Sequence, residues 1–396
     1  MIELNKNLYW VGVKDWELKK FHGEELSTHR GSSYNSYLIR DAKTVLVDTV
    51  WGPFKEAFVS RLEQEVGLEN IDLIVVNHSE TDHSGALAYL MSKIPNTPIY
   101  CTQNGEKMLR KHYHQDWNFN VVKTGDSVNI GEYELVFLEM TMLHWPDSMG
   151  TYVKGANVLL SNDTFGQHYA TSKMFNDEVD TGELYQEAIK YYANILTPFS
   201  HLVKQKIAQI KSLNLPIDLI APSHGVIWRK DPLQIVDKYY EWSQDYHENS
   251  VVIAYDTMWE GTKKMAQAIG EGLAEQGVTV KIYNVAKKDK NDVITEIFKA
   301  KGVLLGSSTI NNGILSAMAA LLEEIKGLKF KNKVAAAFGS YGWSGEGVKI
   351  ITQKLDEAKL QVVEDGIKFA YQPTVEELEQ CKEFGRNFAR HIPDRR

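Results

Sequence analysis

Cysteine is scarce in this sequence: the 396 residues include only Cys101 and Cys381, which lie far apart and form no Cys-x-x-Cys pair. Disulfide frameworks and cysteine-ligated metal or iron–sulfur sites need several cysteines at short, fixed spacings. The sequence therefore predicts neither kind of site, and it contains no four-cysteine iron module of its own. If the protein moves electrons, the carrier must be an organic cofactor or a separate protein.

Long apolar runs and an excess of positive charge are missing as well. Residues 1–6 contain no apolar signal core, and no run is long enough to span a bilayer. The formal net charge of −8 argues against a nucleic-acid surface and favours partners with basic docking faces. We therefore expect a cytoplasmic protein with neither a membrane nor a nucleic acid as its partner.

The composition is that of a folded protein, with 43% hydrophobic and 24% charged residues. A chain of 396 residues is too long for one ordinary core, so we expect two domains. The pattern of elements changes near residue 250, after a polar and acidic stretch at 242–249. The predicted domains are therefore residues 1–249 and 250–396.

The first domain has many short strand signals, which are β-branched or aromatic and separated by polar turns. The predicted strands are 8–13, 34–40, 44–49, 71–76, 98–102 and 217–221. Two further strand regions contain a turn: 127–140 turns at Gly131, and 150–162 forms a hairpin with its loop at 154–157. The predicted helical regions are 53–66 and 182–213. Antiparallel strands with helices outside them indicate a layered α/β sandwich.

The second domain alternates strictly between strands and helices. The predicted strands are 251–255, 279–285, 302–306, 333–339 and 361–369, and the helices are 262–276, 291–299, 317–326, 347–359 and 374–391. The last helix begins with a capping box formed by Thr374 and Glu377. Five successive strand–helix units predict a doubly wound parallel sheet.

A dense group of metal-ligating residue types follows the predicted strand 71–76. Residues 77–85 read Asn-His-Ser-Glu-Thr-Asp-His-Ser-Gly, which places His78, Glu80, Asp82 and His83 within six residues. Burying four such groups is costly unless each finds a partner, and a metal ion supplies that partner for all of them. The sequence therefore predicts a metal site here; the alternative is a polar loop with two incidental histidines.

Three further candidate ligands lie at the ends of later predicted strands or in the loops that follow them. They are His144 in Leu-His-Trp-Pro-Asp-Ser-Met, Asp163 in Ser-Asn-Asp-Thr-Phe-Gly and His224 in Pro-Ser-His-Gly. Loops held by rigid strand ends give metal ligands fixed positions. A lone loop histidine is more often a surface or hydrogen-bonding residue, so the prediction depends on the whole set.

Three loops of the second domain are suited to a phosphorylated, flat ligand. Residues 255–262, Tyr-Asp-Thr-Met-Trp-Glu-Gly-Thr, form the first strand-to-helix turn, where hydroxyls and backbone N–H groups bind phosphate. This loop is neither Gly-x-Gly-x-x-Gly nor a nucleotide P-loop. Loops 306–315 and 339–345 follow the third and fourth strands, where open sheets bind ligands. The alternative is that these are ordinary glycine-rich turns with packing aromatics.

The hydroxyl-rich first loop, which has no basic residue at its centre, resembles the loop that holds the phosphate of FMN in flavodoxins. Trp259, Tyr341 and Trp343 supply aromatic faces for ring stacking. The predicted FMN contacts are Thr257, Met258, Trp259, Gly261, Thr262, Ser307, Thr309, Ile310, Asn311, Asn312, Ser340, Tyr341, Gly342, Trp343 and Gly345.

The order His-x-Glu-x-Asp-His, then His, Asp and His, resembles the metallo-β-lactamase superfamily. That resemblance implies two metals: one held by His78, Glu80 and His144, the other by Asp82, His83 and His224, with Asp163 bridging them. Hydrolases of the superfamily usually carry histidine where this chain has Glu80. A carboxylate makes the site harder and more anionic, which suits iron better than zinc.

Together the two halves resemble the flavodiiron proteins, also called A-type flavoproteins, over essentially the whole chain. The motifs are His-Ser-Glu-Thr-Asp-His, His-Trp-Pro-Asp-Ser-Met, Asp-Thr-Phe-Gly-Gln-His, Tyr-Ala-Asn-Ile-Leu, Tyr-Asp-Thr-Met-Trp and Thr-Ile-Asn-Asn-Gly. The resemblance implies the minimal two-domain class: a metallo-β-lactamase-like αββα sandwich with two non-haem iron ions, then a flavodoxin-like domain with FMN. It implies reduction of dioxygen to water, of nitric oxide to nitrous oxide, or of both. Glu260-Gly261 departs from the small pair common in the family, which leaves the phosphate contacts there less certain.

The resemblance also implies partners that the composition does not show. The expected electron donor is a rubredoxin-type protein, with a deazaflavin donor as the alternative. The expected assembly is a head-to-tail homodimer, alone or as a dimer of dimers, in which each flavin faces the partner's iron site. His22, His168 and Tyr192 are candidates for positions around the metals, although each alone is more often a structural residue.

Two other functions stay open at this point. One is a zinc hydrolase that carries a flavodoxin-like domain as a regulator, against which Glu80 argues. The other is an electron-carrying flavoprotein with a vestigial first domain, against which the full set of seven ligands argues. Metal analysis separates the three: two irons per chain, zinc, or no metal.

Overall fold

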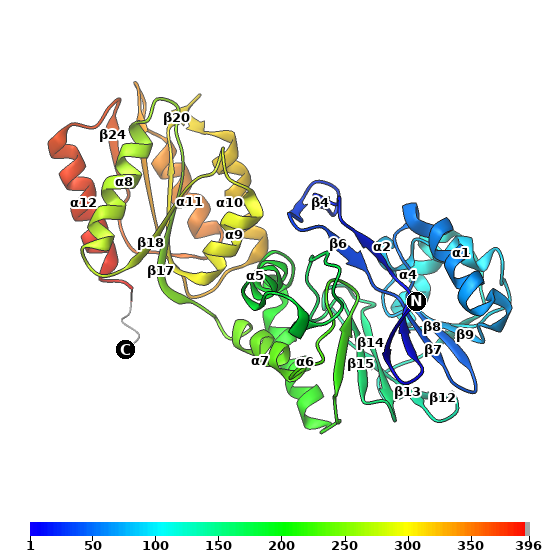
Figure 1. Ribbon diagram of the computed structural model, residues 1–396. Helices are drawn as coiled ribbons and strands as arrows, with labels where there is room; N and C mark the ends of the chain where they lie inside the picture. Colours follow the sequence, from blue (N-terminus) through cyan, green and yellow to red (C-terminus); the bar gives the residue numbers. More distant parts are fainter. Residues whose placement is uncertain (393–396) are drawn as a thin grey trace. The chain divides into compact units, whose positions relative to one another are not determined.

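The computed structural model describes residues 1–392, which form two compact units (Figure 1). The first unit comprises Met1–Tyr191 and Phe199–Glu241. The second comprises Tyr192–Pro198 and the chain from Trp242 onward. The chain thus contributes one short segment to the second unit before it finally leaves the first, near the domain border predicted at 249/250.

The first unit is built on two sheets that face one another. The first sheet has the order β1-β2-β7-β8-β9-β10-β11, and the second has the order β12-β13-β14-β15-β16. Their strands are β1 (Ile2–Asn5), β2 (Leu8–Trp10), β7 (Tyr37–Arg40), β8 (Thr44–Val47), β9 (Leu73–Val75), β10 (Ile99–Cys101), β11 (Phe119–Val121), β12 (Ser127–Asn129), β13 (Glu134–Glu139), β14 (Met149–Lys154), β15 (Val158–Asn162) and β16 (Leu219–Pro222). Two small ribbons pair β3 (Val13–Asp15) with β6 (Ser32–Tyr34) and β4 (Lys20–Phe21) with β5 (Leu26–Ser27).

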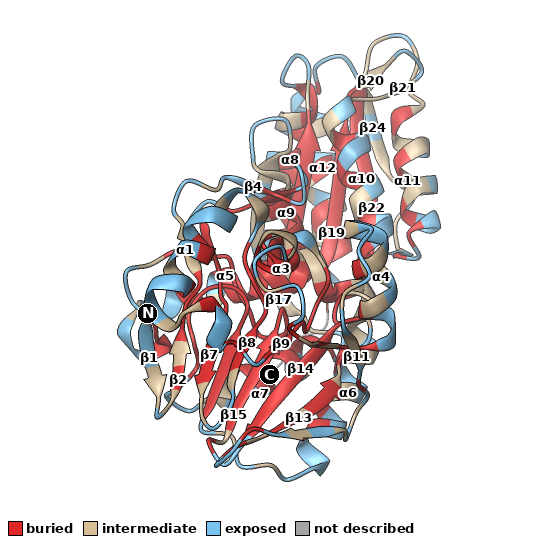
Figure 2. Cartoon of the chain, turned by 90° about the vertical axis from the view of Figure 1, so that its right-hand side faces the viewer, coloured by how far each residue is buried: buried red, intermediate tan, exposed pale blue. Residues whose placement is uncertain are grey.

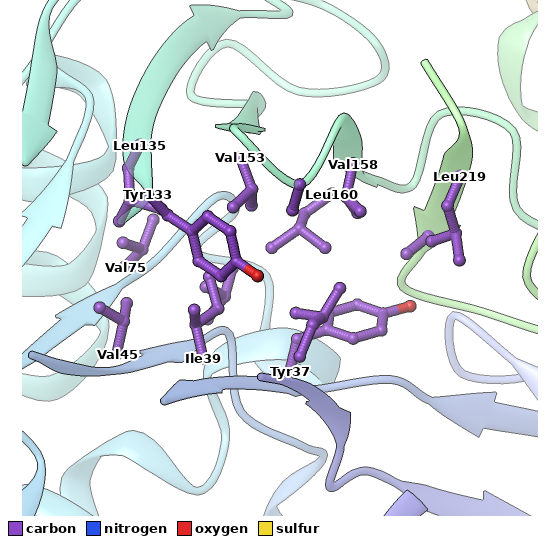
Figure 3. Close-up of a cluster of buried hydrophobic side chains, with 14 of the residues drawn as sticks. Tyr37, Ile39, Val45, Val75, Tyr133, Leu135, Val153, Val158, Leu160 and Leu219 are labelled. Atoms are coloured by element: carbon purple, nitrogen blue, oxygen red, sulfur yellow. The ribbon is translucent and has the colours of Figure 1, made fainter. Parts of the chain in front are cut away.

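The core of this unit lies between the two sheets (Figure 3). Aliphatic and aromatic side chains such as Ile39 and Val45 on one sheet face Val153, Val158 and Leu160 on the other. Helices cover the outer faces: α1 (Lys55–Val66), α2 (Thr81–Ser84), α3 (Leu87–Met91), α4 (Gln103–Tyr113), α5 (Thr181–Tyr191), α6 (Ser200–Ser212) and α7 (Leu233–Trp242). This arrangement is the predicted αββα sandwich, which the structure confirms.

The second unit has one parallel sheet of order β18-β17-β19-β22-β23, with β24 also paired to β22. This order is the flavodoxin-like doubly wound one, and it confirms the predicted fold class. The strands are β17 (Glu248–Asp256), β18 (Thr279–Asn284), β19 (Ala300–Ser307), β22 (Val334–Tyr341), β23 (Gln361–Val362) and β24 (Ile367–Ala370). The helices are α8 (Gly261–Ala274), α9 (Lys290–Lys299), α10 (Ser316–Leu328), α11 (Gly347–Glu357) and α12 (Val375–Ala389). In Figure 2 the central strands β17, β19 and β22 are buried and the helices expose one face, as a doubly wound sheet requires.

Several element boundaries differ from the predicted ones. The predicted strand 361–369 is divided into β23 and β24, and the predicted helix 182–213 is interrupted by a π-helical turn at Tyr192–Leu196 and a 3-10 turn at Thr197–Phe199. Pro198 lies at this interruption, where it lacks the backbone N–H that a continuous helix needs. Helices α4 and α7 and the β4–β5 ribbon were not predicted. The capping box of Thr374 and Glu377 is confirmed at the start of α12.

Candidate metal centre and flavin loops

Strand ends of the first unit bring seven potential ligands together at one edge of the sandwich. His78 follows β9, Glu80 precedes α2, and Asp82 and His83 lie in its single turn. His144 lies between β13 and β14, while Asp163 and His224 follow β15 and β16. All are at most 9% exposed except Glu80, which is partly buried.

Two groups of ligand atoms form within this set. The donor atoms of His78, Glu80, His144 and Asp163 all lie within 4.8 Å of one another. The donor atoms of Asp82, His83 and His224 form a second group within the same limit. The groups are those that the family resemblance implies for the two metals.

Asp163 contacts both groups, one through each carboxylate oxygen. Its Oδ1 lies 3.1 Å from Nε2 of His83 and 3.4 Å from Nε2 of His224. Its Oδ2 lies 3.4 Å from Nε2 of His144 and 3.6 Å from Nε2 of His78. A carboxylate with this arrangement is suited to bridge two cations.

Several buried polar atoms in the cluster have no hydrogen bond among the described residues. They are both carboxylate oxygens of Asp82, Nε2 of His83 and Oδ2 of Asp163. Leaving such atoms unpaired costs about 1–3 kcal/mol each, and more when the group is charged. Imidazole nitrogens and carboxylate oxygens are the donors that non-haem iron takes, so the residues present fit a pair of iron ions.

The protonation equilibria of the cluster also favour added positive charge. Burial lowers the pKa of His78, but hydrogen bonds with Asp147 and Glu80 outweigh it and raise that pKa to about 10. For His224, burial is likewise outweighed by Asp163 and Asp82, and the pKa rises to about 9. Burial raises the pKa of Asp163, yet the neighbouring imidazoles hold it well below its usual range. The carboxylates therefore attract positive charge, which bound metal ions would provide.

The two other predicted histidines lie beside this cluster. Nε2 of His22 is 3.3 Å from Oε1 of Glu80, and the His22 side chain is 30% exposed. His168 is buried, its ring centroid lies 5.0 Å from that of His224, and its Nδ1 is 2.8 Å from Oγ of Ser32. Burial is the main reason why the pKa of His168 is held well below its usual value, which favours the neutral form of this ring.

Tyr191, and not the predicted Tyr192, faces the cluster. The Tyr191 ring lies 5.2 Å from that of His168 and 6.4 Å from that of His224. The Tyr192 ring packs against Trp242 and Phe298. Successive residues of a helix point about 100° apart, so a one-residue difference moves the hydroxyl to another face. The sequence alone could not show which of the two adjacent tyrosines at the end of α5 faces the cluster.

Sequence reasoning also missed Asp147, which lies within one of the quoted motifs. The carboxylate of Asp147 accepts a hydrogen bond from Nδ1 of His78, and it is buried. Nothing in the sequence shows which histidine that carboxylate contacts, since the two residues are separated by 69 positions.

In the second unit, hydroxyl groups from three strand ends converge at the start of α8. The Thr262 hydroxyl lies 3.0 Å from that of Ser308 and 2.9 Å from that of Ser340. The Thr257 hydroxyl nearby is buried without a hydrogen-bond partner among the described residues. Hydroxyls at the N-terminus of a helix fit a phosphate monoester, so these residues suit the phosphate of FMN.

Glycine is required where α8 begins. A Cβ at Gly261 would lie 2.6 Å from the carbonyl oxygen of Tyr371, so no larger residue fits without displacement. The preceding Glu260 adopts a left-handed conformation with φ 68°, and its carboxylate pairs with the ammonium of Lys263. The unusual acidic residue is thus paired with a cation.

The remaining predicted flavin contacts lie on the two neighbouring loops. Asn311 and Asn312 form the left-handed turn between β20 (Thr309–Ile310) and β21 (Gly313–Ile314). Around these loops Trp259 is 79% exposed and Trp343 is 91% exposed. Both exposed aromatic rings are suited to contact a flat ring as ligand. Ser307, Tyr341, Gly342 and Gly345 belong to the same loops.

Among residues 1–392, no helix is both long and apolar enough to cross a membrane.

Comparison with known proteins finds a matching family for each of the two units. The family model described as "ODP family beta lactamase" matches residues 33–225, and the one described as "Flavodoxin" matches residues 253–385. A curated relative from Escherichia coli O1:K1, "Anaerobic nitric oxide reductase flavorubredoxin", is 52% identical over 393 residues, which cover 98% of this chain and 82% of the relative.

Solved structures with the same fold cover nearly the whole chain. Rubredoxin oxygen:oxidoreductase from Desulfovibrio gigas is 36% identical with a TM-score of 0.96, covering 98% of each chain. The flavodiiron protein from Giardia intestinalis is 34% identical with a TM-score of 0.94, covering 99% of this chain and 96% of its own. Full-length similarity at these identities shows that the chain is an oxidoreductase with FMN and a non-haem diiron site. It excludes both alternative functions, the zinc hydrolase and the electron carrier with a vestigial first domain. The chain belongs to the flavodiiron protein family.

Proposed function

We propose that this protein reduces nitric oxide to nitrous oxide, and dioxygen to water as a second reaction, with FMN passing electrons from an external donor to the diiron site. The observation that carries the proposal is the position of Asp163, whose two oxygens face two separate groups of ligand atoms. Both reactions need several electrons at one place, which a pair of neighbouring redox metals can supply. Nitric oxide is placed first because the 52% identical relative is named a nitric oxide reductase, whereas the oxygen reductase is 36% identical.

The proposed ligands are His78, Glu80 and His144 for one iron and Asp82, His83 and His224 for the other, with Asp163 shared. When bound, the iron pair supplies Lewis acidity and one-electron redox chemistry. Three carboxylates offset most of the charge of two ferrous ions, so the centre can bind a small neutral substrate without a large electrostatic cost.

The protein around the ligands orients them and limits access by water. Nδ1 of His224 donates to the backbone carbonyl of Ser33 at 2.7 Å, which directs Nε2 toward Asp82 and Asp163. The Phe21 ring lies against the rings of His22, His168 and His224 and is 9% exposed. We propose that His22, whose imidazole contacts Glu80 and remains partly open to solvent, is the residue through which protons reach this side of the centre.

FMN is proposed to bind at the carboxyl ends of β17, β19 and β22. The hydroxyls of Thr257, Thr262, Ser308 and Ser340 would hold its phosphate, and the exposed Trp259 and Trp343 would contact its ring. The donor is proposed to be a rubredoxin-type protein that docks where these loops are exposed. The head-to-tail homodimer, alone or doubled, is part of the same proposal.

The test is a metal, flavin and turnover analysis of protein purified without oxygen. We expect about two irons and one FMN per chain, with nitrous oxide formed when a rubredoxin and its reductase deliver electrons from NADH. NADH alone should support little turnover, and added salt should slow the donor-dependent rate because docking is electrostatic. Zinc in place of iron, or fast salt-independent turnover with NADH alone, would contradict the proposal.

The assembly is tested separately. Sedimentation should give a dimer or a tetramer of the 45.0 kDa chain. A fully active monomer would rule out the head-to-tail arrangement.

A further inference from the structure

The two candidate metal positions have the same inner ligands by type. One has His78, His144 and Glu80, the other has His83, His224 and Asp82, and both share Asp163. Two imidazoles and two carboxylates thus serve each position. The ligand types alone therefore do not make the two positions unequal, whereas the groups behind the ligands can.

Those groups differ between His78 and His224. Nδ1 of His78 lies 3.1 Å from both carboxylate oxygens of Asp147. Nδ1 of His224 instead donates to a neutral carbonyl, that of Ser33, at 2.7 Å. An imidazole whose N–H points at a carboxylate is a stronger electron donor through its other nitrogen than one whose N–H points at a carbonyl.

Asp147 is held in place and cannot turn away from His78. Its Oδ2 accepts the backbone N–H of Ser79 at 2.7 Å, and its carbonyl accepts the hydroxyl of Thr102 at 3.0 Å. The same Thr102 hydroxyl accepts the N–H of Gly105 and so caps α4. Asp147 is 1% exposed and His78 is fully buried, so water does not screen this contact.

We propose that Asp147 is a positioning residue that fixes the tautomer of His78, strengthens it as a ligand and thereby makes the two iron positions unequal. The iron beside His78 is then bound more tightly and is harder to reduce than the iron beside His224. This inference rests on the ligand set of the proposed function.

The test replaces Asp147 with asparagine, which keeps the size and one acceptor oxygen but removes the charge. Metal-free, FMN-loaded protein is titrated with ferrous iron in the absence of oxygen. In Asp147→Asn we expect one of the two sites to bind iron 10–100-fold more weakly, while the other site and the FMN content stay unchanged. With 57Fe, one of the two Mössbauer doublets should shift, and the lower of the two iron midpoint potentials should rise.

Two further variants separate ligand tuning from structure. Asp126→Asn is the matched control, because Asp126 in the same unit also accepts a backbone N–H, that of Lys123 at 3.0 Å, but is only partly buried and lies in the loop before β12. It should leave iron binding unchanged. Thr102→Val removes one support of Asp147 and the cap of α4 without altering the charge of Asp147, so it should lower the melting temperature but weaken the same site by a smaller factor than Asp147→Asn.

The results distinguish this inference from the function on which it rests. If wild-type protein fails to bind two irons, the ligand proposal itself is wrong. If the wild type binds two irons and Asp147→Asn binds both with unchanged affinity and spectra, only the inference is overturned. Equal weakening of both sites, or a lower melting temperature of the metal-free variant with no site-specific spectral change, would show a merely structural role and also overturn it.

Discussion

Replacing Asp163 with asparagine tests the shared carboxylate most directly. The substitution keeps the shape of the side chain and removes one of the three carboxylates among the proposed ligands. It also places an amide NH2 where one carboxylate oxygen now faces a pair of imidazole nitrogens at 3.1–3.6 Å. Ser223, whose hydroxyl donates to Oδ1 at 2.9 Å, would hold the amide in that orientation.

The size of the effect follows from the number of contacts that are lost. Removing a group behind a ligand typically costs 10–100-fold in metal affinity. Asp163 is itself a proposed ligand and contacts both groups, so the loss should exceed 100-fold at one iron at least, which is more than about 2.7 kcal/mol. Turnover requires both irons and should fall to below about one-hundredth of wild type under limiting iron.

The assay measures iron and FMN per chain, flavin reduction by the donor, and consumption of nitric oxide and dioxygen. Asp163→Asn should be yellow and reducible, deficient in iron and almost inactive. His168→Ala is the matched comparison, because its ring contacts His224 without facing the ligand oxygens. It should retain both irons and lose less activity. An Asp163→Asn protein with two irons and wild-type turnover would refute the shared-ligand reasoning.

Three other variants test the surrounding structure. Gly225→Ala should destabilise the first unit by at least about 1–2 kcal/mol and weaken iron binding at His224, because φ is +77° and a Cβ would lie 1.5 Å from Oε1 of Gln167; an unchanged melting temperature would contradict this. Burial lowers the pKa of Lys333 from 10.5 to about 7. Between those values the unfolded lysine holds a proton that the folded one lacks, so the free energy of unfolding should rise with pH by up to about 1.4 kcal/mol per unit. Lys333→Met should flatten that slope in denaturation followed by flavin fluorescence, and a slope equal to that of wild type would argue against a neutral lysine. Thr262→Val should weaken FMN about tenfold or more but leave riboflavin, which has no phosphate, unaffected, as flavin fluorescence titration would show.

The second unit was largely predictable because its strand–helix units are local. Each strand is a short apolar run and each helix begins after a recognisable turn, so α8 and α9 begin within one residue of the predicted positions. The predicted strand 361–369 was an exception. Its middle, near Gly366 at φ +31°, is not part of the sheet. The hydrophobic periodicity of the sequence does not indicate this interruption.

The first unit was harder to predict because polar residues form part of its structure. The ribbon of β4 and β5 carries Lys20 and Ser27, with His22 in the turn that follows β4, and has no hydrophobic alternation. It nevertheless brings Phe21 against the cluster. The ligand types could be recognised from their order along the chain. Their outer contacts could not, because hydrogen bonds such as the one between His78 and Asp147 depend on how the loops fold in three dimensions.

The spacing of the ligands along the chain has a consequence for when the centre can form. The first ligand is residue 78 and the last is residue 224, so the set is complete only after β16 has joined its sheet. A chain still being synthesised, or a partly unfolded one, offers scattered side chains and no shared carboxylate. Iron therefore binds the folded first unit and hardly binds the unfolded chain. At a free iron concentration of one hundred times the dissociation constant, each ion adds about 2.7 kcal/mol to the stability of that unit. When iron is scarce, the buried carboxylates repel one another unless protons replace the metal, and the apo form becomes the species most exposed to proteolysis. The supply of iron would thus set how long the protein persists as well as how fast it works.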